Sequence, residues 1–327
     1  MKGLVSMICA TAAAASAVAG FKGEDPRYPD TAEKKFSLPM RVMFVGAHPD
    51  DADYEFGATA TKLVRAGAKV AFVSVCNGNK GHQTMDSDAL ARRRYGETQA
   101  AAKVYGIEKY IVVGAPDCEL EPTVEMRKRI TRIIREFAPH MVVTHRPCDY
   151  HADHRATGQL VQDASYCLGV PLWCPETPVP EVLPFVMYAG DWFTVPRPFK
   201  PDLIVDGDDV IDFTIRALAS HESQLFEWMP PEYGIDPKTI PADSAGRLEF
   251  LRAHVPPDLY RNGELHRALV DRAFGGKGPK YVDVFEICEY SRPPSPPERK
   301  FLASLGFKWV DDCARSDMRC IGDSAAK

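Results

Sequence analysis

The stretch "RVMFVGAHPDDADYEFG", residues 41–57, joins a hydrophobic run to a dense group of polar side chains. Residues 41–47 form an apolar run with the length of a buried strand. His48, Asp50 and Asp51 follow it at once. Ligands of open α/β sheets bind beyond the carboxyl ends of the strands. The stretch therefore predicts a functional site where this strand ends.

Strand-like and helix-like segments alternate beyond this point. Near-continuous apolar strands separated by helices are typical of a parallel sheet that is buried on both faces. We therefore predict an α/β fold with a Rossmann-like, mostly parallel sheet, helices on both faces and a C-terminal elaboration. The expected strands of the first half cover residues 41–47, 69–76, 109–114 and 140–147, and the expected helices cover 57–68, 88–106 and 121–139.

The two ends of the chain differ in composition from the middle. The first residues contain one early lysine, a run of alanine and other small residues, and a small-x-small ending, which together indicate a cleaved signal peptide over 1–19. An uncleaved membrane helix is the alternative, although the apolar part is short for a membrane span. We expect a linker over 20–39, one domain over 40–290 and a tail over 291–327. The protein is then exported, to the periplasm or the extracellular space.

The bulk composition limits the class of partner. The chain has 327 residues and a formal net charge of −5. This charge provides no basic excess for nucleic acid or an anionic membrane, and we expect neither nucleic-acid binding nor an integral membrane protein. Nine cysteines over this length do not form a disulfide scaffold, although Cys313 and Cys320 could pair in an oxidising compartment. The oligomeric state stays open.

A second polar cluster resembles the first. The stretch "HRPCDYHADHRATGQLVQDASY" follows the fourth expected strand, and it carries histidines at 151 and 154. Two such clusters converge on one crevice only if their strands are parallel. His48, Asp51 and His154 then form a two-histidine, one-carboxylate set with an open position. That set suits Zn²⁺ and is also compatible with Fe²⁺.

"AHPDD" and "HADH" together resemble the joint signature of the PIG-L/LmbE-like N-acetylglucosaminyl deacetylases. The resemblance is close over about residues 40–170. It implies zinc ligands at His48, Asp51 and His154, and a general base at Asp50. It also implies that His151 stabilises or protonates the tetrahedral intermediate.

The same resemblance implies supporting roles around these groups. Asp153 would orient a histidine. Arg94, in "RYGE", and Asp117, in "PD", would contact the sugar. The acidic residue that the family places soon after "HPDD" is represented by Asp53 or Glu55. We expect structural roles for the remaining polar residues that the sequence singles out, namely His82, His140, His145, His221 and Glu222.

The expected function is zinc-dependent hydrolysis of the N-acetyl amide of an amino sugar or glycan, with release of acetate. One alternative is an amidase that acts at the same site on a bulkier N-acyl or thiol-conjugate amide. A second alternative is a carbohydrate-binding protein without turnover. The presence of Asp50 argues against the second alternative, because a binding module needs no base.

Overall fold

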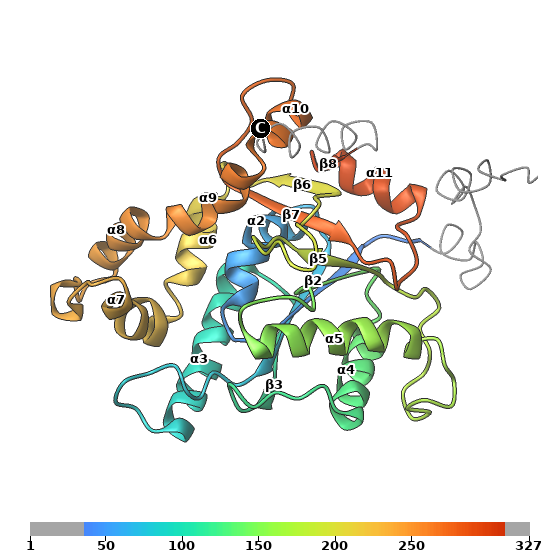
Figure 1. Ribbon diagram of the computed structural model, residues 1–327, viewed down its shortest axis with the longest axis horizontal. Coiled ribbons are helices and arrows are strands. Elements are labelled where there is room, and N and C mark those ends of the chain that lie inside the picture. The colour runs from blue at the N-terminus through green and yellow to red at the C-terminus, as the bar shows by residue number, and fades with distance from the viewer. Residues whose placement is uncertain (1–35, 311–327) are drawn as a thin grey trace, which may run out of the picture.

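A computed structural model describes residues 36–310, which form one eight-stranded sheet with helices on both faces (Figure 1). The expected signal peptide, and Cys313 with Cys320, lie outside the described residues. The described part of the expected tail forms helix α11 (Pro296–Ser304) and strand β8 (Lys308–Trp309). Strand β8 pairs with strand β6 (Leu203–Asp206) and so extends the sheet.

The sheet has the order β3-β2-β1-β4-β5-β7-β6-β8. Neighbouring strands from β3 to β5 run parallel, and β7 is antiparallel to both of its neighbours. These strands are β1 (Arg41–Gly46), β2 (Lys69–Cys76), β3 (Lys109–Ala115), β4 (Met141–Thr144), β5 (Phe185–Ala189) and β7 (Val282–Ile287). The predicted α/β fold with a mostly parallel sheet is confirmed.

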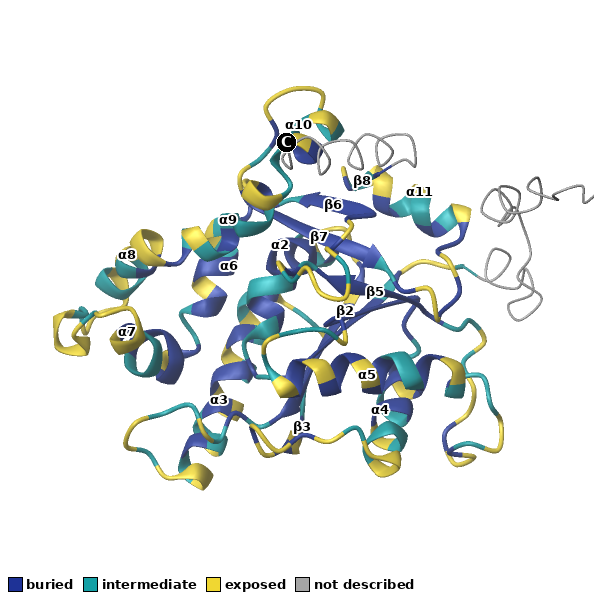
Figure 2. Ribbon diagram, in the orientation of Figure 1, coloured by how far each residue is buried: buried dark blue, intermediate teal, exposed yellow. Residues whose placement is uncertain are grey.

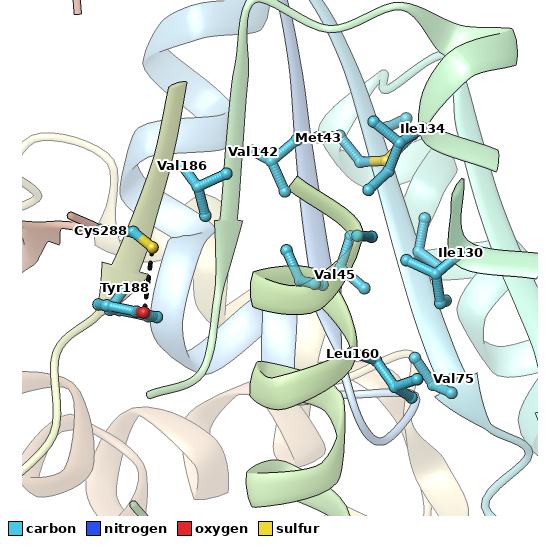
Figure 3. Packing of buried hydrophobic residues seen from close by; sticks show 14 of the residues in the cluster. Met43, Val45, Val75, Ile130, Ile134, Val142, Leu160, Val186, Tyr188 and Cys288 are labelled. Atoms are coloured by element: carbon cyan, nitrogen blue, oxygen red, sulfur yellow. Dashed lines mark hydrogen bonds between the residues drawn. The ribbon is translucent and has the colours of Figure 1, made fainter. Parts of the chain in front are cut away.

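Strand residues alternate between two hydrophobic layers, as the period of a β-strand requires. Met43 and Val45 pack towards helices α4 (Val124–Phe137) and α5 (Ala152–Cys167). Figure 3 shows Ile130, Ile134 and Leu160 meeting these strand residues, with a Tyr188–Cys288 hydrogen bond of 3.1 Å at the edge of the cluster.

The opposite face of the sheet is covered by α2 (Asp51–Arg65), α3 (Ser87–Tyr105) and α11. Phe44 of β1 packs against Phe56 of α2 with ring centroids 5.7 Å apart. Aromatic pairs at such distances add to the free energy of burial. The two layers thus fix α2 and α5, whose first turns carry the polar clusters, against opposite faces of the sheet, where both helices contact β1.

One local expectation differs from the structure. Helix α2 begins at Asp51, one turn and a half before the expected start near Gly57. Helix α3 is capped by Asp86, whose carboxylate accepts from the Ala89 amide at 2.9 Å. Further along the chain, the helix over 211–218 ends before the buried His221, and a π-helix over 223–228 follows it.

The C-terminal elaboration stands beside the end of the sheet that carries the polar clusters. Figure 1 shows α6, α7, α8 and α9 grouped on one side of the molecule, and Figure 2 shows that α7 and α8 expose much of their surface. The elements are α6 (Ile211–Leu218), the π-helix η1 (Ser223–Trp228), α7 (Met229–Glu232), η2 (Pro237–Thr239), α8 (Ser244–His254), α9 (Pro256–Leu265) and α10 (Arg267–Ala273).

Within residues 36–310, no helix has the length and apolar character that crossing a membrane requires. The six cysteines of this range, Cys76, Cys118, Cys148, Cys167, Cys174 and Cys288, are free thiols.

A buried carboxylate joins α2 to the sheet and should make stability depend on pH. Asp283 of β7 accepts hydrogen bonds from the amide and the hydroxyl of Thr59, and burial raises its pKa to about 7. Because the carboxyl pKa is higher in the folded than in the unfolded protein, the neutral side chain stabilises the fold, and this contribution to the free energy of unfolding is lost as the pH rises from about 4 to 7. Asp283→Asn stays neutral at every pH. We therefore expect its free energy of unfolding, relative to that of the wild type, to increase by roughly 2 kcal/mol between pH 5 and pH 8. Urea unfolding of both proteins across this range measures the difference, and a constant difference would contradict the assignment.

Candidate active site and metal centre

The two polar clusters meet at the carboxyl ends of β1 and β4, which are neighbours in the sheet. Strand order reverses between these two strands, since β2 and β3 continue on one side and β5 on the other. A crevice forms at such a switch point, because the helices that follow the two strands cover opposite faces of the sheet. Side chains beyond the strand ends line this crevice. The expected convergence of His48 with His151 and His154 is therefore observed.

Three donor atoms from these clusters face one another. The distance from His48 Nδ1 to His154 Nε2 is 3.2 Å, and Asp51 Oδ1 lies 3.8 Å from the first and 3.6 Å from the second. Ligands held about 2.0–2.1 Å from a tetrahedral ion lie about 3.3–3.4 Å apart. The three atoms thus fit one divalent ion, and the two-nitrogen, one-oxygen set suits Zn²⁺ or Fe²⁺.

Asp51 presents only one oxygen to this centre. Its Oδ2 accepts from the amides of Ala47 and His48 at 2.8 and 2.7 Å, and His145 Nε2 lies 3.0 Å from it. Burial opposes ionisation, but His154, His145 and His48 lower the pKa of Asp51 well below its usual range. Gly46 makes this approach possible, because a Cβ there would lie 2.9 Å from the Asp51 Cβ. Asp51 is consequently an ionised carboxylate with Oδ1 available.

His145 was expected to be a packing or edge residue, and it does more than pack. Its Nδ1 lies 3.3 Å from Glu55 and its ring stacks on His154, with centroids 4.1 Å apart. Burial lowers the pKa of His145, but Glu55 and Asp51 outweigh it and hold that pKa well above its usual range. Glu55, His145 and Asp51 therefore form a continuous line of alternating acidic and basic side chains behind the centre.

Each histidine of the centre has a carboxylate on its far nitrogen. Asp153 Oδ2 lies 3.1 Å from His48 Nε2, and Asp149 Oδ1 lies 3.2 Å from His154 Nδ1. The amide of Cys118 also donates to Asp153 at 2.7 Å, and together with His48 it overcomes burial and lowers the pKa of Asp153 to about 2. Carboxylates in these positions fix the ring tautomers, so that His48 Nδ1 and His154 Nε2 are left for a metal.

His48 itself gains basicity from these partners. Burial lowers its pKa, but the bonds to Asp153 and Asp51 raise it to about 10. A metal binds only a deprotonated nitrogen, so binding at Nδ1 competes with a proton.

His151 lies beside the three donors and is held differently. Its ring centroid is 4.6 Å from that of His48, and its Nδ1 accepts from the Asp153 amide at 3.1 Å as the N-cap of α5. Burial and the charges of His48 and His154 lower the pKa of His151. An Nδ1 that accepts a hydrogen bond leaves the proton of the neutral ring on Nε2. His151 is thereby a neutral donor.

Asp50 is the N-cap residue of α2, but its carboxylate caps no amide. Instead its Oδ2 lies 2.9 Å from Arg94 Nη2, and the Arg94 side chain is only 3% exposed. Burial lowers the pKa of Arg94, but Asp50, Asp117 and Glu97 raise it overall. Gly78, with φ of +73°, gives Arg94 its space, because a Cβ there would lie 2.4 Å from the Arg94 Cδ.

The other expected site residues lie around this ion pair. Asp117 is buried and accepts from the Gly78 amide at 2.8 Å, so it holds the loop that packs on Arg94. Its expected contact with sugar stays a prediction. Asp53 is buried against His221 at 3.0 Å, whereas Glu55 reaches the cleft.

The sequence analysis did not single out Asp149, and it did not place His145 at the site. Asp149 accepts from the His151 amide at 2.8 Å, a local Asx turn that the spacing "DYH" could have indicated. His145 directly follows the last residue of β4, and a polar side chain at that end of a parallel strand is the signal that pointed to the other clusters.

A cleft of about 370 Å³ opens beside Asp51 and His154. The exposed rings of Tyr150 and Trp192 line it and lie 6.4 Å apart at 21°. Its outer wall comes from α7 and α9, which Figure 1 places next to this end of the sheet. The elaboration thus turns an open crevice into a walled site.

Residues 43–165 match the PIG-L family, described as GlcNAc-PI de-N-acetylase. The diacetylchitobiose deacetylase of Thermococcus kodakarensis is 32% identical over 200 residues, which are 59% of this chain and 73% of that protein. The 1D-myo-inositol 2-acetamido-2-deoxy-alpha-D-glucopyranoside deacetylase of Kineococcus radiotolerans is 28% identical over 255 residues, with 59% of this chain and 71% of that protein covered.

Solved structures share the fold. The N,N'-diacetylchitobiose deacetylase of Pyrococcus horikoshii superposes with a TM-score of 0.59 at 24% identity, covering 80% of this chain and 90% of that chain. The 4-carboxy-2-hydroxymuconate hydratase of Pseudomonas putida superposes with a TM-score of 0.58 at 17% identity, covering 78% and 98%. The same fold therefore carries more than one chemistry.

The geometry predicts which substitutions remove a metal. We expect His48→Ala, Asp51→Ala and His154→Ala each to lower the metal content of the purified protein from about one ion per chain to near zero. His151→Ala and His145→Ala are the matched controls, since both rings lie in groups that could hold an ion with His154. Elemental analysis of the five variants checks this. Loss of metal from His151→Ala but not from His48→Ala would assign the ion to a different set.

Proposed function

This chain belongs to the PIG-L family of N-acetylglucosaminyl deacetylases, and on that premise we propose that it is a metal-dependent hydrolase that removes the acetyl group from an N-acetylated amino sugar or glycan. One observation carries the proposal. A carboxylate that caps no helix and binds no ligand histidine, Asp50, directly precedes a carboxylate, Asp51, whose Oδ1 faces two imidazole nitrogens.

The proposed ligands are His48, Asp51 and His154. A divalent ion held there supplies Lewis-acid polarisation and makes water acidic near neutral pH. The structure supports this set through the fit of its donor atoms and through the carboxylates behind both rings.

Asp50 is the proposed general base. It takes a proton from the attacking water and later passes that proton to the leaving nitrogen, so that water and an amide become acetate and a free amine. Arg94 supports the first role because its charge keeps the Asp50 carboxylate in place. Asp153 serves as a positioning residue for His48.

His151 is the proposed donor to the amide oxygen. Negative charge develops on this oxygen during attack, and a fixed N–H aimed at it lowers the barrier. The cap bond from Asp153 to Nδ1 supports this role, since it leaves the proton on Nε2 before the substrate arrives.

The cleft supports a sugar as the substrate. Tyr150 and Trp192 offer flat, exposed rings beside Asp51, and such rings combine an apolar face with a polar edge. The carboxylate of Asp258 lines the same cleft and is able to accept from hydroxyl groups.

The proposal as a whole is tested by acetate release. Incubation with N-acetylglucosamine, N,N'-diacetylchitobiose and longer glycans should yield acetate, and a chelator should stop its release until Zn²⁺ or Fe²⁺ is restored. Binding of these sugars without release of acetate would instead favour a carbohydrate-binding protein.

The role of Asp50 gives a sharper prediction. Asp50→Asn keeps the shape but accepts no proton, so we expect kcat to fall by about 10²-fold or more with the metal retained. Asp51→Asn is the matched control, which should lose metal affinity first and regain activity with excess metal. Metal content and kcat are measured on both. A near-normal kcat for Asp50→Asn would remove Asp50 as the base.

Arg94 is predicted to act on kcat because of its ion pair with Asp50. We expect Arg94→Ala to lower kcat about tenfold or more, and Arg94→Lys to recover part of it by restoring the charge. Arg92→Ala, on the exposed face of α3, is the control and should be neutral. Steady-state kinetics distinguish a role of Arg94 in holding Asp50, which changes kcat, from a contact with the sugar, which changes KM. An increase in KM at constant kcat would mean that it contacts the sugar only.

A further inference from the structure

A second cavity of about 440 Å³ adjoins the cleft beside the metal centre. The two share four residues, Tyr54, Met229, Tyr233 and Asp258. Tyr54 lies on α2, one turn after Asp50, so the shared boundary stands close to the proposed base. One ligand can therefore occupy both cavities at once, with one end at the metal centre and the other in the second cavity.

The two cavities differ in chemistry. The cleft contains the carboxylates of Asp51, Glu55, Asp149 and Asp191, whereas the second cavity has one carboxylate, Asp258, at the boundary. The wall of the second cavity is formed by apolar side chains, among them Leu225, Ile235, Phe250, Leu251 and Val255. Apolar walls of this kind hold water poorly and hold hydrocarbon well.

Four of these side chains, Leu225, Phe250, Leu251 and Val255, belong to a hydrophobic cluster that the fold leaves partly open. Leu225, Leu251 and Val255 are buried, but Phe250 and Met229 are only partly buried at its edge. Figure 2 shows that the surrounding helices, α7 and α8, expose large surfaces. Helices cover the two hydrophobic clusters on the faces of the sheet. The cluster beside α7, α8 and α9 differs from them because it is partly open.

We propose that this second cavity is an apolar subsite that binds an alkyl or aryl group carried by the amino-sugar substrate, an inference that rests on the proposed function. The group is either the N-acyl chain or the aglycone of the sugar, since both are hydrocarbon attached to the same polar head. Each methylene buried in the cavity strengthens binding by about fourfold at most.

The test measures binding apart from catalysis. The full-length, metal-loaded chain carrying Asp50→Asn is titrated by calorimetry with N-acetylglucosamine, N-hexanoylglucosamine and the hexyl β-glycoside of N-acetylglucosamine. We expect one of the two hexyl-bearing ligands to bind at least about tenfold more tightly than N-acetylglucosamine. Which of them gains identifies the source of the apolar group.

Substitutions at the cavity wall locate the gain. Ile235→Trp, in the loop after α7, fills the cavity and should abolish the tenfold gain, while Ile235→Ala leaves the fold intact with the cavity open and should keep most of it. Val179→Trp is the matched control, because Val179 is 37% exposed in the loop between α5 and β5 and lines neither cavity.

Each outcome decides the inference. Equal affinities of the three ligands, or a gain that survives Ile235→Trp, would overturn it. Release of the carboxylic acid by the wild type is measured in parallel: acetate from N-acetylglucosamine and from its hexyl β-glycoside, and hexanoate from N-hexanoylglucosamine. A binding gain that Ile235→Trp abolishes, without release of acetate or hexanoate from any of the three ligands, would keep the subsite and refute the proposed amide hydrolysis.

Discussion

The division of the Asp51 carboxylate is the interaction on which the site depends. Its Oδ2 accepts from the Ala47 and His48 amides and contacts His145. Its Oδ1 faces His48 Nδ1 and His154 Nε2. An ionised carboxylate in a largely enclosed position is costly unless it is hydrogen-bonded. The turn after β1 supplies those bonds from its own backbone. The same bonds fix where the helix begins, so the start of α2 and the orientation of the ligand have one cause.

Around this carboxylate, each proposed ligand histidine is paired with an acidic side chain, and the proposed base is paired with a basic one. Asp153 stands behind His48, Asp149 behind His154, and Arg94 behind Asp50. Such partners set the tautomer or charge of the inner group and restrict its rotation. Arg94 is in turn held by a loop that Asp117 ties to the end of β3. The parallel strands β1 to β4 therefore contribute to the centre both directly and through the loops that follow them.

The fold alone does not determine the chemistry, since a deacetylase and a hydratase superpose on this chain at similar TM-scores. The difference must come from the side chains at the switch point and from the wall built by α7, α8 and α9. In this chain the wall is made of an apolar cluster that opens next to a polar cleft. With an apolar cavity next to the polar cleft, the protein can select a substrate by an apolar group that lies away from the reacting amide.

The sequence by itself determined the sheet, the two clusters and their convergence. Apolar strands of uniform direction put His48, Asp51, His151 and His154 at one edge, because successive parallel strands all end there. Only the tertiary structure decided the partners. Arg94 lies on a helix face that could have been solvated, and its contact with Asp50 depends on the packing of α3 and on the space left by Gly78. His145 and the wall of α7–α9 were decided in the same way, because their contacts join segments about 100 or more residues apart, and no local spacing encodes such distances.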